Sequence, residues 1–261
     1  MTPSTGHTFG SLNYATMHKV LLIVIFMLSV MSSNAQDTIP PQVPKSKKRK
    51  MPKKEMLLVN LNFDSWVSHP SYVSPQWGAS RGVDVAILYD YVLGKSNFSL
   101  AGGLGFNSHN IHSEGFPVVY NTIDGDTYTK LDTSFFRGQD ISVNKISTNF
   151  IDIPLEVRFR SRAHKNGKRI AAAIGFKLGF LVQSHTKTET ETEYNINGVD
   201  IGTKFKTYDI ENLTFFRYGL TARVGYANFY LNFFYSLTPL FEDGRGTEAT
   251  PISIGIGVSP F

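Results

Sequence analysis

Cysteine is absent from all 261 residues of the chain. No disulfide can therefore stabilise the fold, and no thiol is available as a nucleophile or a metal ligand. The sequence also lacks a phosphate-binding glycine motif, a zinc-ligand cluster and a nucleotide-binding fingerprint. Glycines do gather in "AGGLGF", but they lie within a strand pattern, where they favour the curvature of a sheet over phosphate binding. We expect no cofactor and no metal.

Apolar runs are short as well. The run from Val20 to Val30 contains one serine and falls well below the ~20 residues that a membrane-spanning helix needs. A short basic segment precedes it, and the small residues Ser33 and Ala35 follow it, which is the order found in a cleaved secretory signal peptide. We assign residues 1–35 to this signal, with Met17 as an alternative start. No cysteine follows the run, so a lipid-anchored lipoprotein is excluded.

Residues 36–54 combine proline with basic side chains and contain almost no apolar residue. This composition cannot bury a core and predicts a disordered tether. Residues 1–54 carry eight positive charges and one negative charge, so the formal net charge of +5 leaves about −2 for the rest of the chain. The basic residues of the tether are Lys45, Lys47, Lys48, Arg49, Lys50, Lys53 and Lys54.

Basic runs of this kind are typical of nuclear import signals and nucleic-acid-binding arms. A chain exported through a secretory pathway meets neither the import machinery nor a chromosome, so we expect no nucleic-acid partner. The tether instead suits anionic lipid headgroups or another envelope polyanion, at about 1 kcal/mol for each basic residue near the surface. A solvated tail without a partner is the alternative.

From residue 55 onward, apolar and polar residues alternate with a period of two. In "TNFIDIPLEVRFRSR", for example, Ile151, Leu155 and Phe159 share one face, and Glu156 and Arg158 lie on the other. Such alternation predicts strands with one apolar face. Eight runs of this kind are present, at about residues 56–67, 81–93, 96–110, 145–162, 169–186, 213–226, 228–239 and 250–261.

The connections between these strands alternate between short and long. Short segments follow the second, fourth and sixth strands, and the others are the long segments 68–80, 111–144, 187–212 and 240–249. Bacterial outer-membrane barrels have this arrangement, with an even number of strands, tight periplasmic turns and longer outside loops. Several strands also reach the ~9–11 residues that a tilted strand needs to cross a bilayer.

The distribution of side chains over the two faces decides between a membrane barrel and a soluble one. The apolar face is branched and aromatic, and it ends in tyrosines near the strand ends, as an interfacial girdle does. The other face mixes glycine, alanine, serine and charge. The interior of an eight-stranded barrel is only wide enough to be filled by side chains, so large apolar residues from every strand would overfill it. We therefore expect the apolar face to meet lipid; a soluble, lipocalin-like periplasmic barrel is the structural alternative. The girdle tyrosines are Tyr89, Tyr91, Tyr218, Tyr226 and Tyr235.

The chain resembles the outer-membrane β-barrel domain proteins of Bacteroidota that are often called PorT-like. The residues that carry this resemblance are "NFIDIPLEVRFR", the following "FKLGF" and the terminal "ISIGIGVSPF". It covers roughly residues 55–261, and the long basic tether departs from the simpler members. The resemblance implies a barrel in the outer membrane and implies little about activity, because its motifs are strand patterns rather than catalytic signatures.

The small and charged face predicts a layer of ion pairs inside the barrel. Charges that cannot face lipid are expected to pair with one another as a plug in the lumen. A narrow ion path whose pairs set selectivity is the alternative. The predicted residues are Asp84, Asp90, Glu156, Arg158, Arg160, Lys177, Arg217 and Arg223, and the same alternation places Gln183 on this face.

Hydrolytic chemistry has one candidate, the segment "NSHNIHSEG". Ser108 and His109 with a nearby acid could be read as a nucleophile and its base. His109 and His112 differ by three positions, however, so on a strand they point to opposite faces, which also weakens a two-histidine metal site. We interpret the segment as a strand running into a polar loop.

Two motifs lie in the long connections. "TIDGDTY" offers two carboxylates around Gly125, but it lacks the ligand ladder of a dedicated calcium loop, and an Asp-Gly hairpin turn explains it better. "HTKTETETEY" alternates threonine with charge, which indicates that the strand continues beyond the membrane as a ribbon.

The sequence thus predicts an all-β protein: an eight-stranded antiparallel transmembrane β-barrel, residues 55–261, behind a signal peptide and a disordered tether. We expect it in the outer membrane, with the tether and C-terminus periplasmic. Its expected role is non-enzymatic, a structural or binding role in the envelope with the outside loops as contact surface. A narrow-pore channel or a transport or secretion accessory is the first alternative, and a lipid-modifying or proteolytic enzyme is the second.

Overall fold

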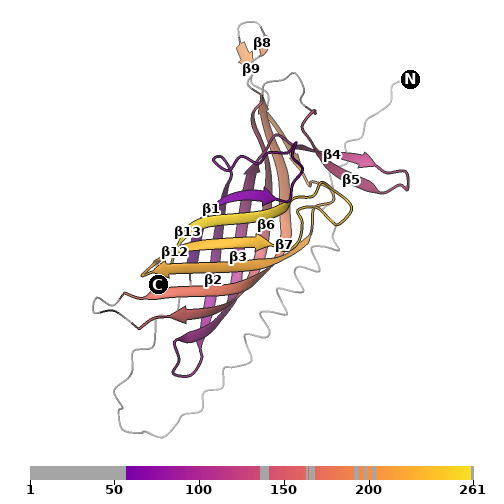
Figure 1. Cartoon of the computed structure of the whole chain (residues 1–261). Coiled ribbons are helices and arrows are strands. Elements are labelled where there is room, and N and C mark those ends of the chain that lie inside the picture. Colours follow the sequence, from indigo (N-terminus) through magenta and orange to yellow (C-terminus); the bar gives the residue numbers. More distant parts are fainter. Residues whose placement is uncertain are drawn as a thin grey trace, which may run out of the picture. The chain divides into compact units, whose positions relative to one another are not determined.

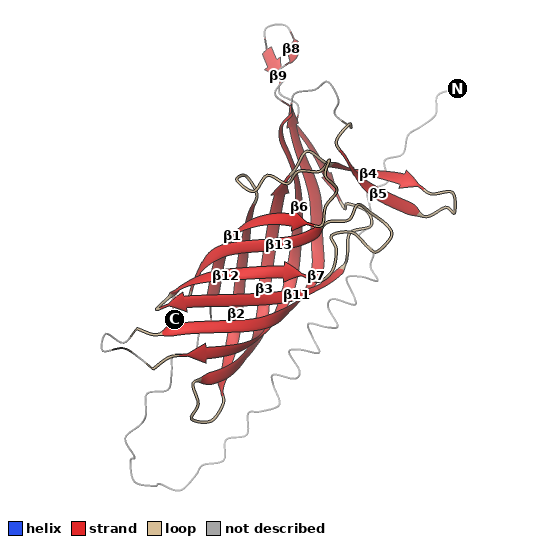
Figure 2. Cartoon of the chain, viewed as in Figure 1, coloured by secondary structure: helices blue, strands red, loops and turns tan. Residues whose placement is uncertain are grey.

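The computed structural model describes residues 57–135, 141–162, 164, 168–190, 194–196, 199–201 and 204–259. The assigned signal (1–35), the tether (36–54) with its seven basic residues, and Phe261 lie outside these described residues. The described part of the chain is all-β (Figure 2). Within it, no helix has the length and apolar character needed to cross a membrane.

Eight strands form the barrel and five shorter ones lie in the connections. The barrel strands are β1 (Leu57–Val67), β2 (Arg81–Val92), β3 (Phe98–His112), β6 (Ile141–Arg160), β7 (Ile170–Thr190), β11 (Phe216–Tyr226), β12 (Phe229–Ser236) and β13 (Thr250–Val258). The shorter ones are β4 (Phe116–Asn121), β5 (Thr127–Asp132), β8 (Tyr194–Ile196), β9 (Val199–Ile201) and β10 (Lys204–Tyr208).

Each barrel strand pairs antiparallel with its two neighbours (Figure 1). The order β1-β2-β3-β6-β7-β11-β12-β13 closes because β13 returns to β1, from Val59 opposite Val258 to Val67 opposite Thr250. Closure leaves no unpaired strand edge in the barrel wall. An open sheet in lipid would have such edges, and their N–H and C=O groups would find no hydrogen-bond partner. The predicted eight-stranded antiparallel barrel is therefore confirmed, and each predicted strand has its counterpart.

The longest strands extend past the barrel wall. β6 and β7 have 20 and 21 residues, and β10 pairs with the far part of β7, so that β6, β7 and β10 form a three-stranded extension. The predicted ribbon in "HTKTETETEY" is thus confirmed up to Thr190. The predicted hairpin turn is also confirmed: Gly125 has a φ of 86° between the paired strands β4 and β5.

One face assignment is wrong. β7 carries an extra residue at Val182, because Phe150 pairs with Leu181 whereas the adjacent Asn149 pairs with Gln183. A bulge of this kind reverses the alternation beyond it. Gln183 therefore lies on the outer face, where the amide of Asn149 donates a hydrogen bond to it at 2.9 Å, and not on the charged face where the alternation had placed it.

The outer and inner faces of the barrel have opposite character. Large apolar side chains are exposed all around the wall, among them Ile87 at 62%, Ile174 at 68% and Phe229 at 72%. The inward side chains that alternate with them are buried, and most of these are polar, charged or small. A protein that folds in water has the reverse distribution, and only an apolar solvent around the barrel makes this one favourable.

Candidate functional site in the barrel lumen

The centre of the lumen is occupied by charges from four strands. Lys177 on β7 is buried, and its Nζ lies 2.5 Å from Asp84 Oδ2 on β2 and 3.5 Å from Asp152 Oδ2 on β6. Arg217 on β11 reaches the same carboxylate, with Nη2 at 3.1 Å from each oxygen of Asp152. Two cations and two carboxylates thus share one small volume, because their side chains point inward from β2, β6, β7 and β11.

A histidine extends this cluster toward the long loops. His109 on β3 is buried, with Nε2 2.7 Å from Arg217 Nη1 and Nδ1 3.0 Å from Asp64 Oδ2 on β1. Ser253 donates its hydroxyl to the other oxygen of Asp64 at 2.6 Å. The guanidinium of Arg217 also stacks over the Phe150 ring at 3.7 Å. Each charge in this part of the lumen is therefore held by at least one specific neighbour.

A second cluster fills the end of the lumen near the short turns. Glu156 accepts hydrogen bonds from Arg158 Nε and Arg223 Nη2, both at 2.8 Å. Asp90 accepts one from Arg160 Nη1 at 2.6 Å and lies 3.7 Å from Arg158. The two carboxylates therefore hold three arginines in a continuous ion-pair network.

Glycine makes room for the pairs. A Cβ at position 179 would lie 2.5 Å from Asp152 Oδ1 and 2.7 Å from Arg217 Nε, closer than any side chain can stand. A Cβ at position 82 would lie 2.3 Å from Asp64 Oδ2. The alternation pattern predicted small residues on the inner face but not their role. These residues leave the space in which the charged side chains pair.

The structure places all eight residues of the predicted charge layer in the lumen. Sequence reasoning left out three members of the network, Asp64, His109 and Asp152. Asp152 could have been found from the alternation of "TNFIDIPLEVRFRSR", and Asp64 from that of "LNFDSWV". With them, five cations (Lys177, Arg158, Arg160, Arg217 and Arg223) are paired with four carboxylates (Asp84, Asp90, Asp152 and Glu156) among the described residues, and Asp64 contacts His109.

The hydrolytic candidate is not assembled. Ser108 lies on the outer side of β3, whereas His109 lies inside, so the two side chains are on opposite faces of the wall. Inside the lumen, the Ser253 hydroxyl donates its hydrogen bond to Asp64 and not to His109. Within the described ranges, no group of histidine and carboxylate side chains has the geometry to hold a metal ion.

Three small cavities lie between the side chains of the lumen. They measure about 40 Å³ beside Asp84 and Lys177, about 20 Å³ beside His109 and Arg217, and about 10 Å³ beside Arg158. One water molecule needs roughly 10–15 Å³. The lumen therefore has room for a few waters between the ion pairs.

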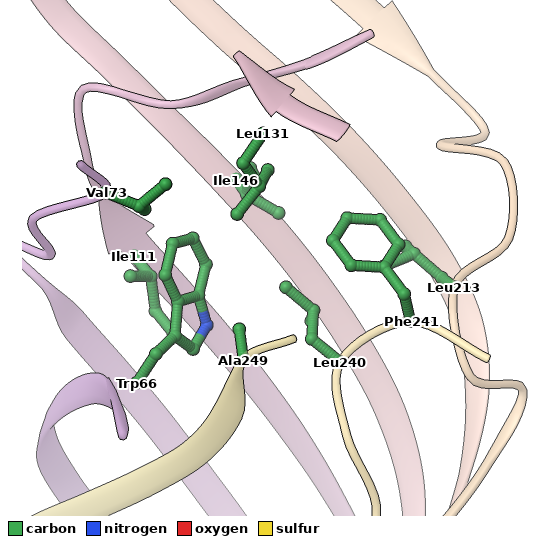
Figure 3. Packing of buried hydrophobic residues seen from close by; sticks show 9 residues of the cluster. All are labelled: Trp66, Val73, Ile111, Leu131, Ile146, Leu213, Leu240, Phe241 and Ala249. Atoms are coloured by element: carbon green, nitrogen blue, oxygen red, sulfur yellow. The ribbon is translucent and has the colours of Figure 1, made fainter. Parts of the chain in front are cut away.

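An apolar cluster, which we term the loop-end cap, closes the lumen at the end of the long connections (Figure 3). Trp66 from β1, Ile111 from β3 and Ile146 from β6 point into it from the wall, and Val73 and Leu131 come down from the connections. Val73 and Leu131 are completely buried. The cap consists of Trp66, Val73, Ile111, Leu131, Ile146, Leu213, Leu240, Phe241 and Ala249.

Backbone hydrogen bonds join the long connections above the cap. Thr129 of β5 donates its N–H to the Arg245 carbonyl at 2.9 Å, and its carbonyl accepts the N–H of Thr247 at 3.0 Å. Its hydroxyl donates to the Glu211 carbonyl at 3.0 Å. The β4–β5 hairpin is thereby tied to two other connections, which fixes the cap in place.

Outside the barrel, the β4–β5 hairpin carries a carboxylic acid, Asp132, whose pKa is lowered. Ser134 and the phenol of Tyr120 donate hydrogen bonds to Asp132, and these bonds, with those from Ser134 the larger cause, lower the pKa of Asp132 to about 2. The hydrogen bond to Asp132 in turn raises the pKa of Tyr120. The carboxylate thus fixes the base of the hairpin at neutral pH.

A closed barrel with an apolar outside and paired charges inside is the architecture of an outer-membrane protein. A family model described as "Outer membrane protein beta-barrel domain" matches residues 58–242, well over half of the chain. The chain belongs to this family, and its place is the outer membrane. A search of curated proteins found no match.

Proposed function

We propose that this protein is a non-conducting, non-enzymatic barrel of the outer membrane, whose long connections face outward and bind a ligand or surface of the envelope. The observation that supports this most strongly is the filled lumen. A path for ions would have to pass both the paired charges and the loop-end cap. Removing one partner from a buried ion pair costs about 3–5 kcal/mol, so the paired charges favour a lumen that stays closed.

The long connections offer an apolar contact surface. Ile123 at the tip of the β4–β5 hairpin is fully exposed, and Val119 and Tyr120 on the same hairpin are more than 40% exposed. Apolar residues that gather on a protruding, hydrogen-bonded hairpin are typical of interaction sites. This supports a binding role for the outside loops over a purely structural one.

The separation of Ser108 from His109 by the barrel wall favours a role without hydrolysis. An enzyme that modifies lipid or cleaves peptides would need another nucleophile. Turnover of labelled lipids or peptides by the purified protein, retained in His109→Ala and Ser108→Ala variants, would identify an enzyme with a different site. The expected result is no turnover in any of the three.

The finer assignments extend the family match. We propose a PorT-like member from Bacteroidota, exported by the signal in residues 1–35, with tether, short turns and C-terminus in the periplasm. The basic residues of the tether then lie where anionic headgroups of the inner leaflet or a periplasmic polyanion can be bound. Labelling of the intact cell, described at the end of the Discussion, tests this orientation.

Conductance across a planar bilayer tests the closed lumen. The barrel is first shown to be folded by its altered migration in gels before boiling. The folded protein is then expected to give no discrete current steps, whereas steps that recur with a single amplitude would establish the narrow-pore channel in its place. Denatured protein serves as the control for unspecific leakage.

A further inference from the structure

Three lysines stand side by side across the sheet that extends β6 and β7 beyond the barrel. Lys145 on β6 pairs directly with Lys187 on β7, and Lys187 pairs directly with Lys206 on β10. Residues that pair in this way project from the same face of an antiparallel sheet. We term Lys145, Lys187 and Lys206 the lysine row. His112 on β3 pairs with Lys145 and continues the row toward β2.

The row lies on the outer face, in line with the residues that meet lipid. Along β6 the outward side chains run from Ile151 through Asn149 and Ser147 to Lys145. Six residues of strand span roughly 20 Å before tilt is considered. The outer surface therefore changes from apolar to amide to cationic in the order in which a membrane changes from acyl chain to headgroup.

Positive charge prevails around the row. Arg81 lies beside it on β2, and Lys204 follows on β10. Among the described residues, Glu189 is the carboxylate in contact with these cations, 2.7 Å from Lys187 Nζ and from Lys204 Nζ. Both hydrogen bonds, that from Lys187 first, lower the pKa of Glu189 to about 2. Four lysines and one arginine are thus offset by one acid.

Among the described residues, no second carboxylate is in contact with these cations; Lys145 donates a hydrogen bond to the Asn110 side chain at 3.0 Å, and Lys206 lies over the Tyr208 ring at 4.7 Å. Like charges directly opposite each other destabilise a sheet. Burial, and after it the charges of Lys187 and Lys206, lowers the pKa of Lys145. Burial, and after it the neighbouring cations, likewise lowers the pKa values of His112 and His185. The field of the row is therefore available to an external anion.

We propose that the lysine row binds the phosphate of an anionic lipid at the membrane surface. A phosphate carries three acceptor oxygens with up to two negative charges, and lysine recognises it as a compact point charge with three rotatable donors. A lipid is favoured over a soluble anion because the row continues the lipid-facing surface. With the orientation proposed above, on which this part of the inference rests, the lipid is a phosphorylated glycolipid of the outer leaflet.

The test compares two triple variants of the full mature chain, folded in uncharged detergent. One carries Lys145→Gln, Lys187→Gln and Lys206→Gln. The matched control carries Lys95→Gln, Arg162→Gln and Lys168→Gln, which removes three exposed charges at the short-turn end. Retention of diphosphorylated lipid A is measured by native mass spectrometry, with dephosphorylated lipid A and inorganic phosphate as the other probes. Altered gel migration before boiling shows that each variant is folded.

The row variant is expected to retain lipid A on the order of a hundredfold more weakly, because each basic residue near an anionic surface contributes about fivefold. The control variant is expected to retain lipid A as strongly as the unmodified protein, which would show that loss of charge alone does not explain weaker retention. Dephosphorylated lipid A is expected to be retained weakly, which would show that the acyl chains alone do not explain retention. Equal losses in both variants would overturn the site. Binding of inorganic phosphate as tight as that of lipid A would overturn the lipid and identify a soluble phosphoanion.

Failure of this inference and failure of the proposed function give different results. The row variant leaves the lumen untouched, so its bilayers are expected to remain silent whatever happens to lipid retention. Current steps from unmodified protein that retains lipid A would contradict only the closed lumen. Silent bilayers with unchanged lipid retention in the row variant would contradict the lysine row alone.

Discussion

The charges inside the barrel and those on its extended outer face are arranged in opposite ways. In the lumen, five cations are paired with four carboxylates, and a fifth carboxylate, Asp64, contacts His109. In the lysine row, like charges stand opposite one another, and Glu189 is the carboxylate in contact with them among the residues that the structure describes. Burial explains the difference: a charge removed from water must be paired within the protein, whereas a charge at a surface can be left for a partner.

Among the substitutions that compare the two regions, removal of a lumen cation is expected to lower the free energy of unfolding the most. Arg217→Ala leaves Asp152 with one cation fewer and should lower the free energy of unfolding by about 3–5 kcal/mol. Arg81→Ala on the exposed outer face should cost less than about 1 kcal/mol. Urea titration of the folded and unfolded gel bands measures both. Equal costs would mean that the lumen pairs contribute no more than surface charges.

The tightness of the lumen can be tested at glycine. Gly179→Ala places a methyl group against Asp152 and Arg217 and is expected to cost about 1–3 kcal/mol through overpacking. Gly78→Ala, where no atom lies within 4 Å of the added carbon, is the matched control and should change stability by less than about 0.5 kcal/mol. A neutral Gly179→Ala would show that the lumen has room for a wider path.

A substitution in the lysine row is expected to change the free energy of unfolding slightly, and in the opposite direction to a substitution in the lumen. Lys145→Gln removes one of three adjacent positive charges and is expected to raise the free energy of unfolding by a few tenths of a kcal/mol, the lower end of the cost of like-charged pairs in sheets. High salt should abolish the gain, because exposed charges are screened. A loss of stability at low salt would show that the row is already neutralised within the protein.

Glu189 gives the row a pH dependence. Its pKa is lowered from 4.5 to about 2 in the folded protein, so its contribution to stability is complete above about pH 4.5 and is lost as the pH falls through about 2. Glu189→Gln should therefore flatten the decline of stability within this window and change little at pH 7. Paired acid titrations of the two proteins measure the difference. An identical acid decline would show that Lys187 and Lys204 do not hold this carboxylate.

The wall of the barrel could be predicted from the sequence because lipid imposes a simple rule on it. Outward residues such as Ile87 and Ile174 must be apolar, so alternation alone gives the strands and the order of short and long connections. The bulge at Val182 could not be predicted, because one extra residue leaves no mark on composition and shows itself only when β7 pairs with β6. Gln183 was misplaced for this reason.

The site was predictable only in part. Alternation identified which charges point inward, but the pairing of Lys177 with Asp84 joins residues 93 positions apart and depends on barrel geometry. The loop-end cap was not predicted, because Trp66 comes from β1 whereas Leu131 and Phe241 come from two separate connections without a common periodic pattern. The lysine row was likewise invisible, since its members lie on three strands and meet only through register.

The accessibility of single cysteines in intact cells tests the central claim most directly, because the chain has no cysteine of its own. We predict that a membrane-impermeant maleimide labels Ile123→Cys on whole cells, labels Lys95→Cys only after the envelope is opened, and leaves Ser253→Cys in the lumen unlabelled until the barrel is denatured. Labelling of Lys95→Cys but not Ile123→Cys on whole cells would reverse the orientation. Rapid labelling of Ser253→Cys in the folded protein would contradict the closed lumen.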